Sequence, residues 1–250
     1  MFENFPKKRT VLSPEFQKIY SEHYKNNREG STSASSLAQK MEAWLHRKVA
    51  KDVIGVQDKS TLEIGAGTLN QLMYEQTMPY DIIEPFSELY INSKFKDQVN
   101  EVFQDIDDIA DSNKYDRITS VATFEHIIDL PKVVAKTCLL LNESGTLRVS
   151  IPNEGTFLWK LGYKLTTGIE FKLKYGLDYS VLMNHEHVNT ADEIEQVLKY
   201  FYDNVKCSCF GISRKIAFYR FYECSKPGIE NAQKYLKSLD RIKEKTLING

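Results

Sequence analysis

The chain has 250 residues, enough for one large domain with a buried core and some additional segments. Hydrophobic residues make up 42% and charged residues 27%, both ordinary for a soluble globular protein. Lys and Arg number 33 against 34 Asp and Glu, which gives a formal net charge of −1. No overall basic field therefore favours nucleic acid, and we expect no nucleic-acid partner.

The sequence contains neither a membrane span nor an export signal. No apolar run approaches the roughly 20 residues needed to cross a bilayer, so we expect no transmembrane segment. The N-terminal residues lack the apolar stretch of a secretory signal. The four cysteines lack the paired spacing of a zinc site, which predicts reduced thiols and a cytoplasmic location.

Two helices are predicted before the first strand. Ser13 and Pro14 are typical of a helix start, and apolar residues then recur at helical spacing. A polar loop over 26–36 separates this helix from a second one over about 37–51. We predict that residues 1–55 form an N-terminal helical cap over the edge of a sheet.

Predicted strands and helices alternate through residues 56–226, which is typical of a mostly parallel sheet with crossover helices. An insertion over 153–189 interrupts this core. Two late β-rich runs, 205–212 and 215–224, predict an antiparallel hairpin, and an amphipathic C-terminal helix is predicted within 227–250. The strands are predicted at 60–64, 80–84, 100–103, 115–121 and 145–151, and the helices at 69–77, 87–93, 106–110, 131–141 and 190–201.

A Gly-x-Gly turn at the end of the first predicted strand is the most informative motif. Gly65 and Gly67 allow close approach of the backbone to a ligand, and Glu84 ends the second strand, where a carboxylate can accept hydrogen bonds from ribose hydroxyls. Asn70 replaces the third glycine of a nicotinamide-binding motif. Glu63 can receive the cationic amine of S-adenosylmethionine, whereas it would repel a pyrophosphate.

These motifs resemble the first two motifs of class I S-adenosylmethionine-dependent methyltransferases, and the similarity covers roughly residues 60–224. Residues 104–106 match the segment whose acid meets the adenine amino group, 121–127 match the segment beneath the cofactor, and 139–147 match the passage into the fifth strand. The resemblance implies an α/β fold with a seven-stranded Rossmann-like sheet, mostly parallel with the last strand antiparallel. It also implies S-adenosylmethionine as the cofactor and S-adenosylhomocysteine as the product.

The resemblance implies a set of cofactor-binding residues, and several of them have a structural alternative. The two glycines could form a plain strand-to-helix turn. Glu84 and Asp105 could each cap a helix, and Glu125 and His126 could begin a solvated helix instead of contacting a ligand. The residues assigned to the cofactor are Glu63, Gly65, Ala66, Gly67, Glu84, Pro85, Asp105, Ile106, Val121 and Tyr24.

The insertion is predicted to determine the acceptor, because it follows the fifth strand at the edge where ligands bind in such sheets. Aromatic residues crowd 157–179, and Lys160, Lys164, Lys172 and Lys174 exceed the acids there. An aromatic, slightly basic flap suits a sugar, a phosphorylated small molecule or a lipid headgroup. The alternative is a hydrophobic helix pair with solvated lysines.

His185 and His187 close this insertion and would point the same way on an extended segment. Either could serve as a general base, because histidine titrates near neutral pH. The pair could also ligate a metal, but the neighbouring residues offer no clear third ligand, so no metal is predicted. The third alternative is packing and capping ahead of the helix that begins near Thr190.

Residues 14–46 resemble methyltransferases from bacterial surface-polysaccharide loci, which favours a sugar, nucleotide-sugar or phosphorylated glycan intermediate as the acceptor. We therefore predict an O- or N-directed methyltransferase for a small molecule, acting as a monomer or homodimer. The alternatives are an RNA or protein methyltransferase, and a non-catalytic partner protein with the same fold.

Overall fold

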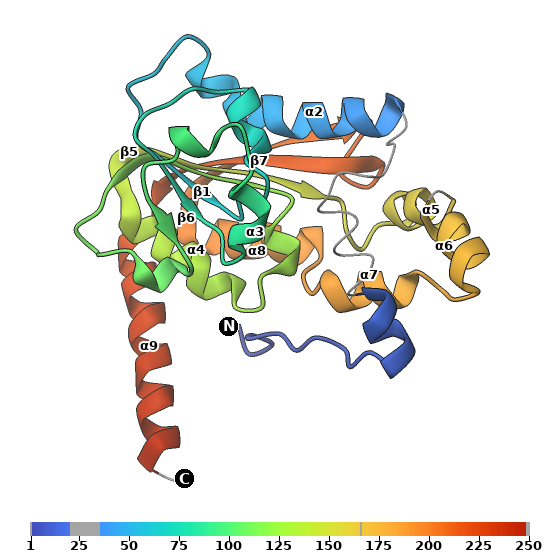
Figure 1. Ribbon diagram of the computed structural model, residues 1–250. Helices are drawn as coiled ribbons and strands as arrows, with labels where there is room; N and C mark the ends of the chain where they lie inside the picture. The colour runs from blue at the N-terminus through green and yellow to red at the C-terminus, as the bar shows by residue number, and fades with distance from the viewer. Residues whose placement is uncertain (1, 21–35, 166, 249–250) are drawn as a thin grey trace.

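Seven strands form one sheet at the centre of the computed structural model, which describes residues 2–20, 36–165 and 167–248 (Figure 1). The strand order is β3-β2-β1-β4-β5-β7-β6, and β7 lies antiparallel between β5 and β6. The remaining neighbours pair in parallel, so the predicted fold class is confirmed. The strands are β1 Thr61–Ile64, β2 Tyr80–Ile83, β3 Val102–Phe103, β4 Tyr115–Val121, β5 Leu141–Pro152, β6 Tyr202–Gly211 and β7 Ala217–Pro227.

Helices cover both faces of the sheet, so that every residue of β1 and β2 is buried (Figure 1). Helix α2 (Ser36–Ala50) packs over β4, β5 and β7, whereas α4 (Leu130–Leu140) and α8 (Ala191–Phe201) cover the opposite face. Helix α2 therefore lies on one face of the sheet. Polar groups of the central strands hold this helix on the face: the Ser150 hydroxyl donates to the Leu45 carbonyl at 3.1 Å.

The segment after β1 is less helical than its apolar spacing predicted. The predicted helix 69–77 is only the 3₁₀ turn η2 (Asn70–Met73), because Leu69 adopts a left-handed φ of 65° and the Gln71 side chain turns into the core. The other helices are α3 Ser87–Tyr90, α5 Phe157–Leu165, α6 Thr167–Tyr175, α7 Ser180–Glu186 and α9 Ile229–Ile248, with the short 3₁₀ turns η1 Lys51–Val53, η3 Lys96–Gln98, η4 Ile106–Asp108 and η5 Phe124–His126.

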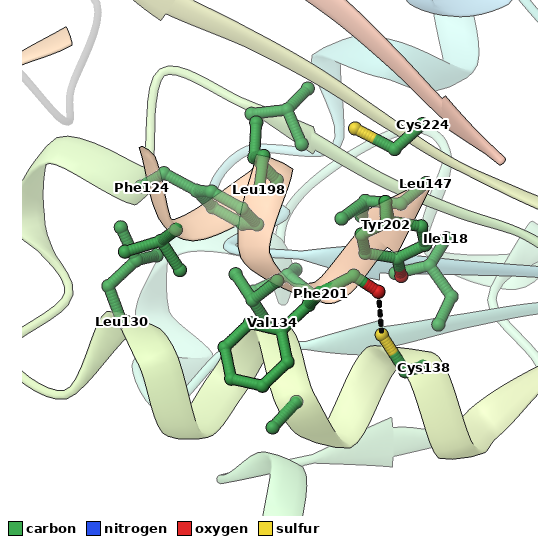
Figure 2. Packing of buried hydrophobic residues seen from close by; sticks show 14 of the residues in the cluster. Ile118, Phe124, Leu130, Val134, Cys138, Leu147, Leu198, Phe201, Tyr202 and Cys224 are labelled. Atoms are coloured by element: carbon green, nitrogen blue, oxygen red, sulfur yellow. Dashed lines mark hydrogen bonds between the residues drawn. The ribbon is translucent and has the colours of Figure 1, made fainter. Parts of the chain in front are cut away.

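The main hydrophobic core lies between the sheet and the α4–α8 layer (Figure 2). Phe124, Val134 and Phe201 are fully buried there, and the Cys138 thiol donates to the Phe201 carbonyl at 3.4 Å. Burying side chains of this size stabilises the fold by about 1.5–3 kcal/mol each. Phe124 therefore fixes the turn after β4 in the hydrophobic core, and other residues of this turn belong to the candidate site.

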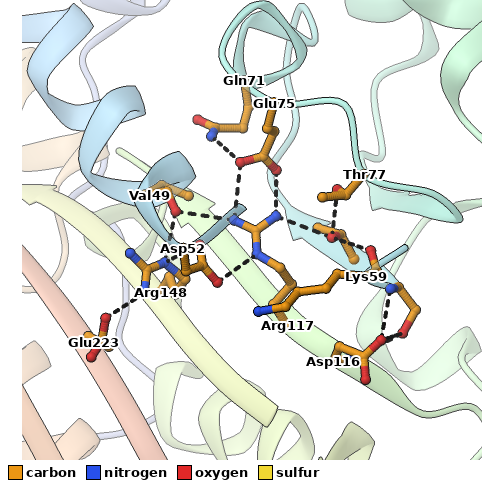
Figure 3. A network of polar contacts seen from close by, with 12 residues as sticks. Val49, Asp52, Lys59, Gln71, Glu75, Thr77, Asp116, Arg117, Arg148 and Glu223 are labelled. Atoms are coloured by element: carbon orange, nitrogen blue, oxygen red, sulfur yellow. Dashed lines mark hydrogen bonds and ion pairs between the residues drawn. The ribbon is translucent and has the colours of Figure 1, made fainter. Parts of the chain in front are cut away.

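Two buried arginines join the other face of the sheet to the end of α2 (Figure 3). Arg117 pairs with Glu75 at 2.7 Å and with Asp52 at 3.2 Å. Arg148 pairs with Asp52 at 3.0 Å and with Glu223 at 2.6 Å. Buried charges of this kind need full hydrogen bonding, and carbonyl oxygens at the end of α2 accept the remaining arginine donors.

The insertion forms three short helices, α5 to α7, beside the carboxyl end of the sheet (Figure 1). Residues 14–20 are also helical, and the side chain of Ser13 caps them as predicted. Leu12 and Ile19 from this N-terminal stretch pack with Phe171 and Leu182 of the insertion in a separate hydrophobic cluster. The N-terminus therefore supports the insertion rather than the sheet edge.

The hairpin and the C-terminal helix follow the predicted order. The turn between β6 and β7 is longer than predicted, because the strands end at Gly211 and begin again at Ala217. Helix α9 packs on α4 and α8 near its start and then extends beyond the sheet (Figure 1). Among the described residues, no helix has the length and apolarity to cross a membrane.

Candidate functional site

A cavity of about 610 Å³ opens at the carboxyl ends of β1, β4 and β5. The turn after β1 forms one wall, the turn after β4 forms the floor, and the insertion forms the opposite wall. Helix α2 and β7 close the remaining sides. This is the edge at which parallel α/β sheets bind ligands.

The Gly-x-Gly turn lines this cavity, and its two glycines have different roles. Gly65 has a φ of 72°, and a Cβ there would lie 2.4 Å from the side chain of Thr123. Gly67 has a φ of 52°, and no atom of the described residues lies within 4 Å of its Cβ position. Gly65 is thus required for close packing inside the protein, whereas Gly67 leaves open space beside the backbone. A cofactor could approach the backbone closely at this position.

Glu63 is 2% exposed and lines the cavity beneath the turn. Its carboxylate accepts a hydrogen bond from the Tyr80 hydroxyl at 2.9 Å. Burial raises the pKa of Glu63 well above its usual range, because the charged form is poorly solvated. A cationic group placed beside it would restore the charged form.

Glu84 lies behind the glycine turn and does not itself line the cavity. Its two carboxylate oxygens accept hydrogen bonds from the backbone N–H groups of Gly67, at 2.9 Å, and Phe86, at 3.1 Å. The carboxylate is therefore fixed in position, with lone pairs remaining for ribose hydroxyls. The bond to Phe86 also fits the alternative of a local turn cap.

Some of the other predicted cofactor residues line the cavity, and others lie outside it. Ala66 and Val121 line the cavity, whereas Pro85 is exposed outside it. Asp105 is exposed and caps η4, with its carboxylate accepting from the Asp107 backbone N–H at 3.0 Å, as the capping alternative predicted. Ile106 is a core residue at 2% exposure. Tyr24 falls outside the described part of the chain.

Glu125 and His126 lie on the cavity floor, in the turn after β4. Glu125 is 1% exposed, so the alternative of a solvated helix start was wrong for it. Two backbone N–H groups, of Val188 and Asn189, donate to the Glu125 carbonyl, and the Asn189 amide donates to the Phe124 carbonyl at 2.9 Å. These bonds fasten the end of the insertion to the turn after β4.

The two predicted base residues lie in different places, because α7 continues through Glu186 and the segment is not extended. His185 packs away from the cavity, where its Nδ1 lies 2.7 Å from the Thr10 carbonyl oxygen. His187 lines the cavity, and its Nδ1 lies 2.8 Å from a carboxylate oxygen of Glu154. Only His187 of this pair can therefore act on a molecule in the cavity.

Three titratable groups meet on the cavity floor: Glu125, His126 and His187. The rings of His126 and His187 are in edge contact, with centroids 4.7 Å apart. Burial raises the pKa of Glu125 to about 7, and burial together with the neighbouring His187 lowers the pKa of His126 to about 4. Burial also lowers the pKa of His187, but the bond to Glu154 and the nearby carboxylates outweigh it and raise the pKa overall.

Aromatic side chains form the side of the cavity that the insertion and β7 provide. Trp159, Tyr163 and Tyr179 of the insertion line it, together with Tyr219 of β7. The four lysines of the insertion are exposed and do not line the cavity, which agrees with the alternative of solvated lysines. Three aromatic residues of the predicted flap are thus at the cavity, and its lysines face solvent.

Sequence reasoning missed the polar wall that α2 contributes. Glu42 and His46 line the cavity, and His46 Nδ1 lies 2.8 Å from the side-chain oxygen of Gln71. The only sequence signal there was an amphipathic helix, which does not distinguish a polar residue facing a cavity from one facing solvent.

The fold and this cavity define a class I methyltransferase, and the comparisons with known proteins agree. A methyltransferase domain model matches residues 34–201, and the chain belongs to this family. No curated protein matches the chain. The predicted methyltransferase class, with S-adenosylmethionine as cofactor, is thereby confirmed.

Solved structures share the fold at low sequence identity. A methyltransferase from Thermotoga maritima, described as a possible histamine N-methyltransferase, has a TM-score of 0.54 at 15% identity, over 85% of this chain and 99% of that one. The plantazolicin methyltransferase BpumL, with a desmethylplantazolicin analogue and S-adenosylhomocysteine, has a TM-score of 0.55 at 15% identity, over 85% and 91%. A Haemonchus contortus phosphoethanolamine N-methyltransferase has a TM-score of 0.50 at 13% identity, over 73% and 52%.

Proposed function

We propose that the chain transfers a methyl group from S-adenosylmethionine to a small-molecule acceptor, of which a sugar, nucleotide-sugar or phosphorylated glycan intermediate is the favoured class. One observation carries the proposal: a single cavity joins the glycine turn to the aromatic and histidine wall. A cofactor at one end and an acceptor at the other would share this space, as an in-line displacement requires.

The residues at the turn fit the cofactor. Glu63 offers a buried carboxylate where a cationic amine would lie, and Gly67 offers open space beside the backbone. Glu84 would hold the ribose from behind the turn. When bound, S-adenosylmethionine supplies an electrophilic methyl group on a sulfonium. The protein therefore has mainly to align the acceptor and exclude water.

The opposite wall supports a compact acceptor with polar groups. Trp159 and Tyr219 lie in edge contact, with centroids 5.5 Å apart, and aromatic faces of this kind suit the C–H surface of a sugar ring. The reacting hydroxyl or amine would lie beside His187. With its Nδ1–H donated to Glu154, this histidine keeps Nε2 available to the acceptor.

The sugar class rests on these aromatic residues and on the resemblance of residues 14–46 to methyltransferases of polysaccharide loci. The RNA alternative is less well supported, because the lysines of the insertion are scattered on its solvent side. The division into cap, core and C-terminal helix, with a monomer or homodimer as the assembly, stays a prediction.

Isothermal titration calorimetry with S-adenosylhomocysteine tests the cofactor half of the proposal. Wild type should bind, and Glu84→Ala should bind about 10–100-fold more weakly, because a carboxylate that receives hydrogen bonds is lost. The exposed Glu143→Ala is the matched control and should bind like wild type. Absence of wild-type binding to either cofactor form would falsify the proposal. Transfer of a labelled methyl group to a panel of sugars and nucleotide-sugars then tests the acceptor class.

A further inference from the structure

We propose that Glu125, His126 and His187 bind a divalent metal cation on the cavity floor, and that this cation holds the acceptor. The inference rests on the proposed function, since it gives the acceptor side of the same cavity a metal. All three residues line that cavity, and their possible ligand atoms lie within 4.8 Å of one another. Such a spacing lets three ligands meet one cation after small side-chain adjustments.

In both histidines Nδ1 lies beside an acceptor oxygen, and Nε2 is the nitrogen that could bind a cation. The Nδ1 atom of His126 lies 3.1 Å from the Glu186 carbonyl oxygen, and the Nδ1 atom of His187 lies 2.8 Å from the Glu154 carboxylate. Each Nδ1 therefore carries a proton, which leaves a lone pair on each Nε2. The Nε2 atom of His126 lies only 3.7 Å from an oxygen of Glu125.

Glu125 supplies an independent sign of a missing partner. Its Oε2 atom is buried and has no hydrogen-bond partner among the described residues, although the rest of the residue is held firmly through its backbone. A buried carboxylate oxygen without a partner destabilises the folded protein. A cation at this position would satisfy it.

The residues behind the ligands have the arrangement expected around a metal. Ligating histidines commonly donate their second N–H to a carboxylate or a backbone carbonyl, which fixes the tautomer and the ring orientation. Glu154 does this for His187 and is itself held by the Trp159 indole N–H. The Glu186 carbonyl does it for His126.

The donor set selects the kind of metal. Two imidazoles and one carboxylate favour Zn²⁺, Fe²⁺, Co²⁺ or Mn²⁺ over Mg²⁺ and Ca²⁺, which prefer oxygen ligands only. Three protein ligands leave at least one coordination position open toward the cavity. An acceptor hydroxyl or carboxylate could occupy it, and the cation would favour loss of a hydroxyl proton to water. His187 would then be a ligand and not the base: the cation would lower the pKa of the acceptor hydroxyl, and water would take its proton.

Titration of the metal-free protein with Co²⁺, followed by visible absorption, tests the site directly. Wild type should bind one Co²⁺ and develop the ligand-field bands of a nitrogen-coordinated ion. His126→Gln, His187→Gln and Glu125→Gln should each weaken Co²⁺ binding by 100-fold or more, and Glu154→Gln by about 10–100-fold. The matched control is His185→Gln: this residue is two positions from His187 but lies outside the cavity, and the variant should bind like wild type.

Circular dichroism and S-adenosylhomocysteine binding establish that each variant is folded, so a loss of Co²⁺ affinity can be assigned to the ligands. The metal proposal is wrong if the wild-type protein neither binds Co²⁺ nor develops the ligand-field bands, with or without S-adenosylhomocysteine. Equal affinity in wild type and all three ligand variants overturns it too. Either result together with normal S-adenosylhomocysteine binding leaves the methyltransferase proposal standing, so the two failures are distinguishable.

Discussion

The carboxylate of Glu84 accepts a hydrogen bond from the backbone N–H of Gly67 at 2.9 Å. These residues end the two motifs that first indicated an adenosine cofactor, and the bond joins the motifs across the tops of two neighbouring strands. The acid thus supports the glycine turn, and in our proposal it also binds the ribose. Its loss should disturb the turn as well as the direct contact.

Glu84→Gln tests this double role. One oxygen becomes an NH₂ group, which cannot accept from the N–H of Gly67 or Phe86. We expect at least tenfold weaker binding of S-adenosylhomocysteine by calorimetry and a small loss in the free energy of unfolding. The exposed Glu143→Gln should change neither. A Glu84→Gln protein with wild-type affinity would show that the carboxylate only caps the turn.

Cofactor binding should release a proton from Glu63. Burial raises the pKa of this carboxyl in the free protein, and the cationic amine of the ligand should lower it, so affinity for S-adenosylhomocysteine should rise with pH. Calorimetry in buffers with different ionisation enthalpies measures the released proton. Glu63→Gln should abolish the release and weaken binding about 10–100-fold. An unchanged proton count in that variant would assign the release to another group.

Gly65→Ala should lower the free energy of unfolding by more than the backbone strain at this position alone predicts. A Cβ at Gly65 would lie 2.4 Å from Thr123, whereas one at Gly55, with a similar φ of 76°, meets nothing within 4 Å. Gly55→Ala should therefore cost only the left-handed backbone strain, about 1–2 kcal/mol. Urea denaturation should show a clearly larger loss for Gly65→Ala. Equal losses would mean that Thr123 moves aside without penalty.

Glu75 should be important for stability although it lies outside the cavity. It pairs with Arg117 through both oxygens, at 2.7 and 3.1 Å, and neither side chain is exposed. Glu75→Gln should lower the free energy of unfolding by about 3 kcal/mol, because a buried guanidinium loses most of its compensation. Lys206→Ala breaks a pair at an exposed lysine and should cost no more than about 1 kcal/mol. Similar losses in the two variants would contradict the prediction.

His46 should make the protein less stable in mild acid. Burial lowers the pKa of His46, against smaller opposing effects from Gln71 and nearby carboxylates. The unfolded chain therefore binds more protons, so this contribution is fully present above the unfolded pKa of about 6.5 and is lost as the pH falls toward the folded value. Urea denaturation between pH 7.5 and 5.5, with chelator present, should show a weaker pH dependence in His46→Asn than in wild type. If wild type and His46→Asn show the same pH dependence, His46 is not the group responsible for it.

Local pattern was enough to predict the strands and most of the helices. Strand periodicity and turn residues depend on neighbours in the chain, and β1, β2 and β4 lie within a residue of their predicted bounds. The predicted helix 69–77 failed because its polar side chains are turned inward by a distant group. Glu75 reaches Arg117, 42 residues along the chain. A prediction based on neighbouring residues does not include that contact.

The sequence by itself determined the class of protein and the cofactor end of the site. Glu63 lies near the end of one strand, and Gly65 and Gly67 follow it; the rule that ligands bind at the carboxyl ends of parallel strands places them at a cavity. Only the tertiary structure decided the end of the cavity that the insertion lines. There Asn189 fastens the insertion to the turn after β4, which brings His187 to Glu125 and His126 and leaves His185 outside. Contacts between segments about 60 residues apart arise from packing and buried hydrogen bonds, which no spacing in the chain encodes.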